Sequence, residues 1–223
     1  MQTFMLALRA TLVTLILTGL VYPLAVTAGA QLVFPHRANG SIVVDEKGQE
    51  VGSELIGQGF ADPAYFHSRP SASGYDAANS AGTNLGPTSK KLRDGQPDDP
   101  TTKDVDESFV GMKALVAAYR TENRLAPGTE VPADAVTRSE SGIDPDITPE
   151  NAALQAKRVA IARGVAVERV LSIVAHNSDG RDLGVLGEDH VNVLELNLAL
   201  DRTFGRTFGR AAHIAGDGGT LAK

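Results

Sequence analysis

The stretch GTNLGPTSKK, residues 82–91, contains residue types that can hold a phosphate: glycines, hydroxyl side chains and a lysine pair. A P-loop, however, needs a glycine, four residues of any type and then Gly-Lys-Ser/Thr. Here Gly82 and Gly86 enclose three residues, and Pro87-Thr88-Ser89 separates Gly86 from Lys90. The spacing therefore favours a structured surface loop, whose glycines we expect in left-handed turns.

Other catalytic or metal-binding patterns are weaker. The chain has no Gly-x-Ser-x-Gly elbow, the mark of many serine hydrolases. Ser71 and Ser73 stand beside His67 and Arg69 only as a local cluster. The five histidines lack metal-ligand spacing, and the acids within 104–107 lack the frame of a calcium loop. We therefore predict no catalytic residue and no metal site, and any nucleotide-binding residue stays unknown.

The composition excludes two classes of function. The chain carries 21 Lys and Arg against 27 Asp and Glu, a net charge of −6. Nucleic-acid binding depends on neutralising phosphates, so no nucleic-acid partner is expected. Because the chain has no cysteine, it can have neither a disulfide framework nor a thiol nucleophile.

The first residues predict a membrane anchor. Residues 10–35 contain no charged side chain, and about 20 apolar residues in a helix cross a bilayer. We predict an N-terminal transmembrane anchor over residues 1–36. Ala28-Gly29-Ala30 also fits the cleavage site of a signal peptide, but the apolar run continues to Phe34. Either interpretation exports the rest of the chain, and a wholly cytoplasmic domain is the disfavoured third.

The remainder, residues 37–201, is predicted to be an α/β (α+β mixed) domain. Apolar segments at 41–44 and 50–56 flank a polar turn and favour a β-hairpin. Residues 61–105 are rich in Gly, Pro, Ser, Asn and Asp and lack periodicity. Such a long loop is usually functional or disordered, and we expect it to be ordered.

Apolar periodicity and capping signals predict helices over residues 107–125, 148–163 and 167–176. The inward faces of the first and third should carry Phe109, Met112, Val116 and Tyr119, and Val170, Leu171 and Val174, respectively. VNVLELNLAL (191–200) nearly alternates but also fits a helix, which we favour. Residues 202–223 are predicted to be a flexible tail.

Three longer stretches together resemble a known family. They are GSELIGQGFADPAYFHSRPSASGYDAANSAGTNLGPTSKKL (52–92), VTRSESGIDPDITPENAALQAKRVAIARG (136–164) and LGEDHVNVLELNLALD (186–201). The chain resembles the C subunit of the Kdp-type potassium-transporting P-type ATPase. It departs from the usual pattern at Thr83, Glu140, Asp146 and Asp189-His190, so no family role is carried over to Asp146 or His190.

The resemblance implies a non-catalytic accessory subunit of a high-affinity potassium importer in the bacterial inner membrane. Its partners would be a channel-like subunit that takes up potassium and a P-type subunit that hydrolyses ATP. The C subunit would assist assembly and turnover and raise the ATP affinity of the P-type subunit. ATP and potassium would thus act through the complex. The N-terminus would be cytoplasmic and the domain extracytoplasmic, so any effect on ATP would be conformational.

Arg69, Tyr65 and Phe66 are the interface candidates, together with Asn84, because arginine and aromatic residues dominate binding hot spots. The alternative is that they pack within the domain. Two other functions stay open: a regulator that contacts ATP directly through a cytoplasmic domain, and an exported binding protein or hydrolase. The latter would need a polar pocket around Arg69 and Ser71.

Overall fold

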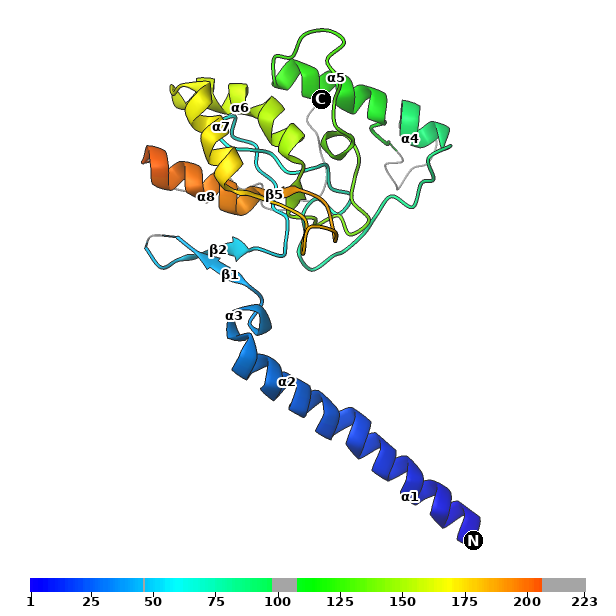
Figure 1. Cartoon of the computed structure of the whole chain (residues 1–223). Coiled ribbons are helices and arrows are strands. Elements are labelled where there is room, and N and C mark those ends of the chain that lie inside the picture. The colour runs from blue at the N-terminus through cyan, green and yellow to red at the C-terminus, as the bar shows by residue number, and fades with distance from the viewer. Residues whose placement is uncertain (46, 98–107, 206–223) are drawn as a thin grey trace.

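A long apolar helix projects from a mixed domain of helices and short strands (Figure 1). The computed structural model describes residues 1–45, 47–97 and 108–205. The helix comprises α1 (Gln2–Ile16), a π-helical turn (Leu17–Val21) and α2 (Tyr22–Val33), and is long and apolar enough to cross a membrane. The π-helical turn precedes Pro23, whose ring would clash with the carbonyl of Gly19 in a regular helix.

The apolar helix leads through the short helix α3 (Pro35–Ala38) into the predicted hairpin, which the structure confirms. Strands β1 (Ile42–Val44) and β2 (Glu50–Ser53) pair antiparallel. The Asp45 carboxylate closes the turn, because it accepts bonds from the backbone N–H groups of Lys47 and Gln49 at 2.8 and 2.9 Å.

The main core lies between a three-stranded antiparallel sheet and three helices. In the sheet, β5 (His190–Asn192) is central between β3 (Asp146–Ile147) and β4 (Ser178–Asp179). The helices are α6 (Pro149–Arg163), α7 (Val167–His176) and α8 (Val193–Phe204). Their buried side chains include Ile147, Val159, Val170, Val191, Leu196 and Leu200. The chain is therefore α+β, as expected.

Capping residues and apolar periodicity correctly predicted the positions of α6 and α7. The Thr148 hydroxyl accepts a bond from the N–H of Asn151 and caps α6, which ends at Gly164 in the left-handed conformation. On α7, Val170 and Val174 are buried, but Leu171 is 38% exposed, so its predicted inward position is wrong. The buried stripe of this short helix follows an i, i+4 spacing that excludes Leu171.

Two predicted boundaries are wrong. Helix α5 (Met112–Glu122) starts later than residue 107, because Phe109 instead pairs with Gln96 through two backbone bonds of 2.9 and 2.8 Å. Helix α8 continues through Phe204, so the predicted tail begins inside a helix. The Arg169 guanidinium lies over the Phe204 ring at 4.8 Å and helps to hold this last turn.

Residues 191–192 also belong to strand β5 and not to the helix favoured for 191–200. Smaller elements complete the fold: α4 (Lys90–Asp94) within the predicted long loop, and a 3₁₀ turn (Ala133–Ala135) beside a second apolar cluster under α5. The candidate acids at 104–107, and the tail after residue 205, lie outside the described residues.

Candidate functional site

The loop 62–69 is clamped by buried side chains from two helices. The Asn197 side chain accepts the N–H of Phe66 at 2.8 Å and donates to its carbonyl at 3.0 Å. Gln155 does the same for His67, at 2.8 and 3.0 Å. Each carboxamide therefore forms two hydrogen bonds with the backbone of one loop residue, as a residue of a neighbouring β-strand would. Both are buried, so the backbone groups of this loop meet a protein partner where water is excluded.

Arg158 forms the centre of the clamp. Its Nη1 donates to the carbonyls of Pro63 and Tyr65 at 2.8 and 2.9 Å, and its Nε donates to Asn123 Oδ1 at 3.0 Å. The side chain is buried, and this burial lowers the pKa of Arg158. A guanidinium presents five N–H donors in a rigid fork, which explains why arginine can hold several acceptors at once.

A third contact group fixes the same loop to α8. The Tyr65 hydroxyl donates to Asp201 Oδ2, and Arg163 Nη2 donates to Asp201 Oδ1, both at 2.8 Å. Arg163 also donates to the Ala64 carbonyl at 2.6 Å and covers the Tyr65 ring at 4.8 Å. The buried ion pair between Arg163 and Asp201 is thus bound to the loop 62–69 by hydrogen bonds.

The structure places the four interface candidates differently. Tyr65 and Phe66 are 2% and 0% exposed and lie in the domain's own core, the alternative that the sequence left open. Arg69 is partly buried, with Nη1 2.7 Å from Asp144 Oδ2. Asn84 is exposed. In this conformation the two aromatic rings are out of reach of a partner, because the clamp holds them inside.

The cluster around Ser71 does not form a nucleophile and base. The hydroxyls of Ser71 and Ser73 both donate to the Gly142 carbonyl. The His67 ring instead places Nδ1 2.7 Å from Glu122 Oε1, a contact that lowers the pKa of Glu122. The hydroxyls and the imidazole thus have separate partners: the hydroxyls join their loop to Gly142, and the imidazole joins it to the end of α5.

The loop 82–91 is closed by its own groups. The Ser89 hydroxyl accepts a hydrogen bond from the backbone N–H of Leu92 and so caps α4. The expectation of left-handed glycines is wrong: Asn84 has φ 54°, while neither Gly82 nor Gly86 has a positive φ. Gly82 is needed for close approach instead, because a Cβ there would lie 2.7 Å from the Glu140 carbonyl oxygen.

Gly82→Ala should therefore destabilise the domain by about 1–3 kcal/mol, as overpacking does. Gly86→Ala is the matched control, because nothing lies within 4 Å of a Cβ at that position, and its effect should stay within about 0.5 kcal/mol. Thermal unfolding of the two purified variants measures the difference. Equal losses would contradict the close-approach role of Gly82.

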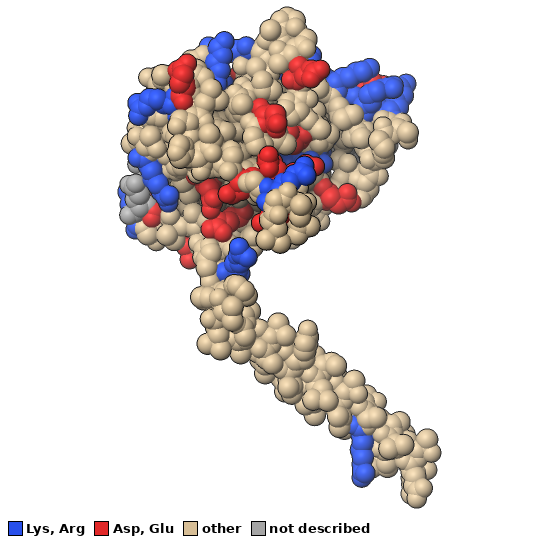
Figure 2. Space-filling model, viewed as in Figure 1, with Lys and Arg blue, Asp and Glu red and all other residues tan. Residues whose placement is uncertain are grey.

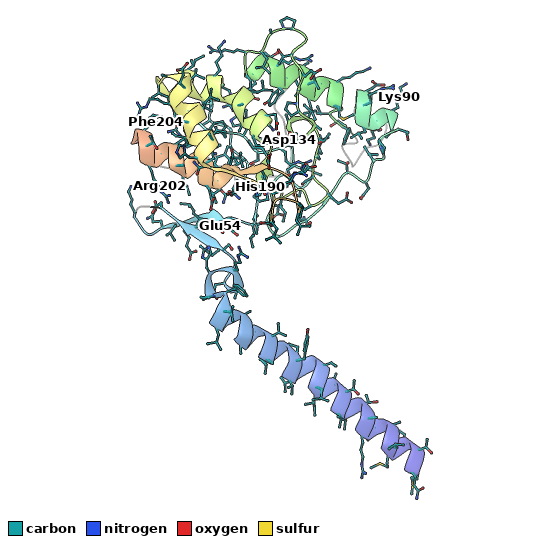
Figure 3. The ribbon with its side chains drawn as sticks, in the orientation of Figure 1. Glu54, Lys90, Asp134, His190, Arg202 and Phe204 are labelled. Atoms are coloured by element: carbon teal, nitrogen blue, oxygen red, sulfur yellow. The ribbon has the colours of Figure 1, made fainter. Side chains whose placement is uncertain are left out.

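Acidic side chains gather on the face above the anchor, where Figure 3 places Glu54 (Figures 2 and 3). Burial, followed by the negative charges of Glu54, Asp179 and Asp146, raises the pKa of Glu195. Burial likewise raises the pKa of Asp146, although His190 opposes the shift. Ionising these groups in the folded state therefore costs stability.

Asp146→Asn should stabilise the domain at neutral pH by about 0.5–1 kcal/mol. A carboxyl whose pKa is raised on folding binds its proton more tightly in the folded state, so stability falls as the pH rises through that raised pKa. The gain should vanish as the pH is lowered to the ordinary aspartate value of about 3.9. Unfolding curves measured across this pH range test the prediction, with the exposed Glu130→Gln as the control. A gain in stability that did not depend on pH would contradict the raised pKa of Asp146.

The clamp residues Gln155, Arg158 and Asn197 were not among the predicted site residues. One signal was present: on helix 148–163, Gln155 shares the i, i+3, i+4 stripe of buried Ala152, Ala156 and Val159. A polar residue in an apolar stripe has to find a buried partner. The pattern could have marked Gln155 as buried, but it does not say which groups Gln155 binds.

These features define a class of protein: a small α+β domain carried on a long apolar helix, with its longest loop clamped to its own helices. The family described as K⁺-transporting ATPase, c chain (KdpC), matches residues 4–202. The potassium-transporting ATPase KdpC subunit of Myxococcus xanthus is 55% identical over 206 residues, covering 92% of this chain and 90% of that protein. Its counterpart in Koribacter versatilis is 48% identical over 195 residues, covering 86% and 91%.

The chain belongs to the KdpC family, which confirms the resemblance drawn from its motifs. It is thus a subunit of a K⁺-transporting ATPase.

Proposed function

We propose that the chain is an accessory subunit that joins a channel-like subunit and an ATP-hydrolysing P-type subunit in a potassium importer, with its domain on the outer face of the membrane. One observation carries the proposal. The apolar side chains of the helix over residues 2–33 are exposed along its length, whereas the domain buries its polar clamp inside. An apolar helix of this length calls for lipid or other transmembrane helices around it.

The junction between anchor and domain supports a role in turnover. The His36 ring places Nε2 3.1 Å from Glu54 Oε1, and the His36 carbonyl accepts the N–H of Ser41 at 3.0 Å. The Ser53 hydroxyl donates to the Gly40 carbonyl at 2.7 Å. These bonds tie the end of the anchor to the hairpin, so a tilt of the anchor in a partner would move the domain with it.

A role in ATP affinity would then be indirect. The loop at 82–91 uses its serine cap and its close glycine contact to hold its own structure, which favours a conformational effect over direct nucleotide contact. Such an effect is a coupling free energy between distant sites and acts through the partner subunits.

Co-purification tests the assembly. A C-terminally tagged full chain is expressed with the other subunits in potassium-starved cells and purified in mild detergent. A P-type ATPase and a channel-like subunit should be recovered with it at comparable amounts. A chain that is recovered alone, from membranes shown to contain those subunits, would overturn the proposal.

Single-cysteine labelling tests the topology, because the chain has no cysteine of its own. Ala78→Cys, in an exposed loop, should react with a membrane-impermeant maleimide in intact spheroplasts, and Thr3→Cys should react only after permeabilisation. The reverse pattern would place the domain in the cytoplasm.

A further inference from the structure

The turn between β4 and β5 exposes a cluster of large apolar side chains. Leu183, Val185 and Leu186 are 91%, 73% and 59% exposed. Outside the anchor, the other exposed large apolar side chains of the described residues reach 61% at most, at Leu55. Three such side chains within four residues form a small apolar surface, hereafter the apolar tip.

The apolar tip is held by hydrogen bonds of its own. The backbone N–H groups of Val185 and Leu186 donate to the Asp182 carbonyl at 3.2 and 2.9 Å, and Gly184 donates to Arg181 at 3.0 Å. Leu183 has φ 53°, a left-handed conformation that a leucine adopts at a cost. The turn therefore presents its leucines outward in a defined geometry, although burying them would be favourable.

The charges around the apolar tip indicate what covers it. Arg181 contributes one positive charge, and Asp182, Glu188 and Asp189 contribute three negative charges, so the segment carries −2. An anionic surface, whether of lipid or of protein, would repel this segment, because like charges repel one another. An apolar socket with basic residues at its rim is complementary to both features.

The apolar tip also lies toward the end of the domain that carries the apolar helix. Its strand β5 is tied to the end of the hairpin, because Asn192 Nδ2 donates to the Glu54 carbonyl at 2.8 Å. In Figure 1 the connection between β4 and β5 lies on the lower part of the domain, from which the anchor leaves. A membrane subunit seated beside the anchor can therefore reach the apolar tip.

We propose that the apolar tip inserts into an apolar socket with a basic rim on the outer face of a membrane subunit of the same complex. The proposal rests on the accessory role proposed above. It adds the docking element and the chemistry of the surface that receives it.

Site-specific photo-crosslinking in the assembled complex tests the proposal. Leu183 is replaced by p-benzoylphenylalanine in the tagged full chain, and the control carries the same group at Ile161, which is 47% exposed on α6. Irradiation should join residue 183, but not residue 161, to a channel-like or P-type subunit identified by mass spectrometry. An adduct with a second copy of the chain, an adduct with lipid alone, or no adduct would overturn the proposal.

A substitution provides the second measurement. Leu183→Ser with Val185→Ser should weaken retention of the membrane subunits about tenfold or more, because both side chains then lose the apolar burial that docking would give them. Ile161→Ser should leave retention unchanged. Raising the salt concentration should weaken the unaltered complex, because part of the attraction is between charges. Unchanged retention in the double variant would contradict the docking role.

The two proposals can fail separately. A tagged chain recovered without any partner before irradiation overturns the accessory role, and the docking proposal with it. An intact complex without a crosslink at residue 183 overturns only the docking proposal.

Discussion

Arg158→Ala is expected to destabilise the domain by about 3 kcal/mol or more, because buried acceptors left without a donor cost about 1–3 kcal/mol each. The substitution removes the Arg158 hydrogen bonds to the carbonyls of Pro63 and Tyr65 and to the side-chain oxygen of Asn123. For a chain of this size the loss corresponds to a decrease in unfolding temperature of roughly 6–12 °C. The loop 62–69 would also lose the centre of its clamp.

Circular dichroism of the purified full chain in detergent measures the effect. Lys157→Ala, on the exposed side of the same helix, is the matched control and should change stability by no more than about 0.5 kcal/mol. Arg158→Lys should fall between the two, because an ammonium group keeps the charge but lacks the planar fork. If Arg158→Ala and Lys157→Ala unfolded at the same temperature, the clamp would not be what holds the loop 62–69.

Elements with signals close in sequence could be predicted. The hairpin follows from a polar turn at residues 45–48, where Asp45 closes the backbone with its own side chain. Helix α6 follows from Thr148, Pro149 and Gly164, each of which acts within one helical turn of its position. The information that determines these elements is contained in a few neighbouring residues.

Contacts between distant segments could not be predicted in the same way. Gln155 and His67 are 88 residues apart, and no local pattern says which loop backbone a buried carboxamide will satisfy. The late start of α5 has a similar cause. Phe109 continues the apolar stripe of a helix, but its pairing with Gln96 outweighs that preference.

The reason for the glycines in residues 82–91 could not be predicted from the sequence either. The pattern at 82–91 indicates that glycine is required, but not whether for its conformational freedom or for its lack of a side chain. At Gly82 the second reason applies, since the Glu140 backbone approaches closely. The left-handed residue is Asn84, whose short side chain tolerates that conformation. Only the packing of the two segments distinguishes these possibilities.

Asp201→Ala is expected to be as severe as the loss of Arg158. It leaves the Arg163 guanidinium, whose side chain is 2% exposed, as a buried charge without its carboxylate. Removing one partner of a buried ion pair costs about 3–5 kcal/mol. Tyr65→Phe removes only the hydroxyl that donates to Asp201 and should cost about half as much, roughly 1.5–3 kcal/mol.

A double substitution separates the effect of charge from that of lost packing. If the unpaired charge dominates, Asp201→Ala combined with Arg163→Met should be more stable than Asp201→Ala alone, because an ion pair replaced by apolar groups no longer leaves a buried charge. Arg202→Ala, exposed on the same helix, controls for general effects on α8. Chemical denaturation of Asp201→Ala, Tyr65→Phe, the double variant and Arg202→Ala gives their free energies of unfolding. A double variant less stable than the single one would show that the Arg163 contacts with Ala64 and the Tyr65 ring, and not its charge, are what the domain depends on.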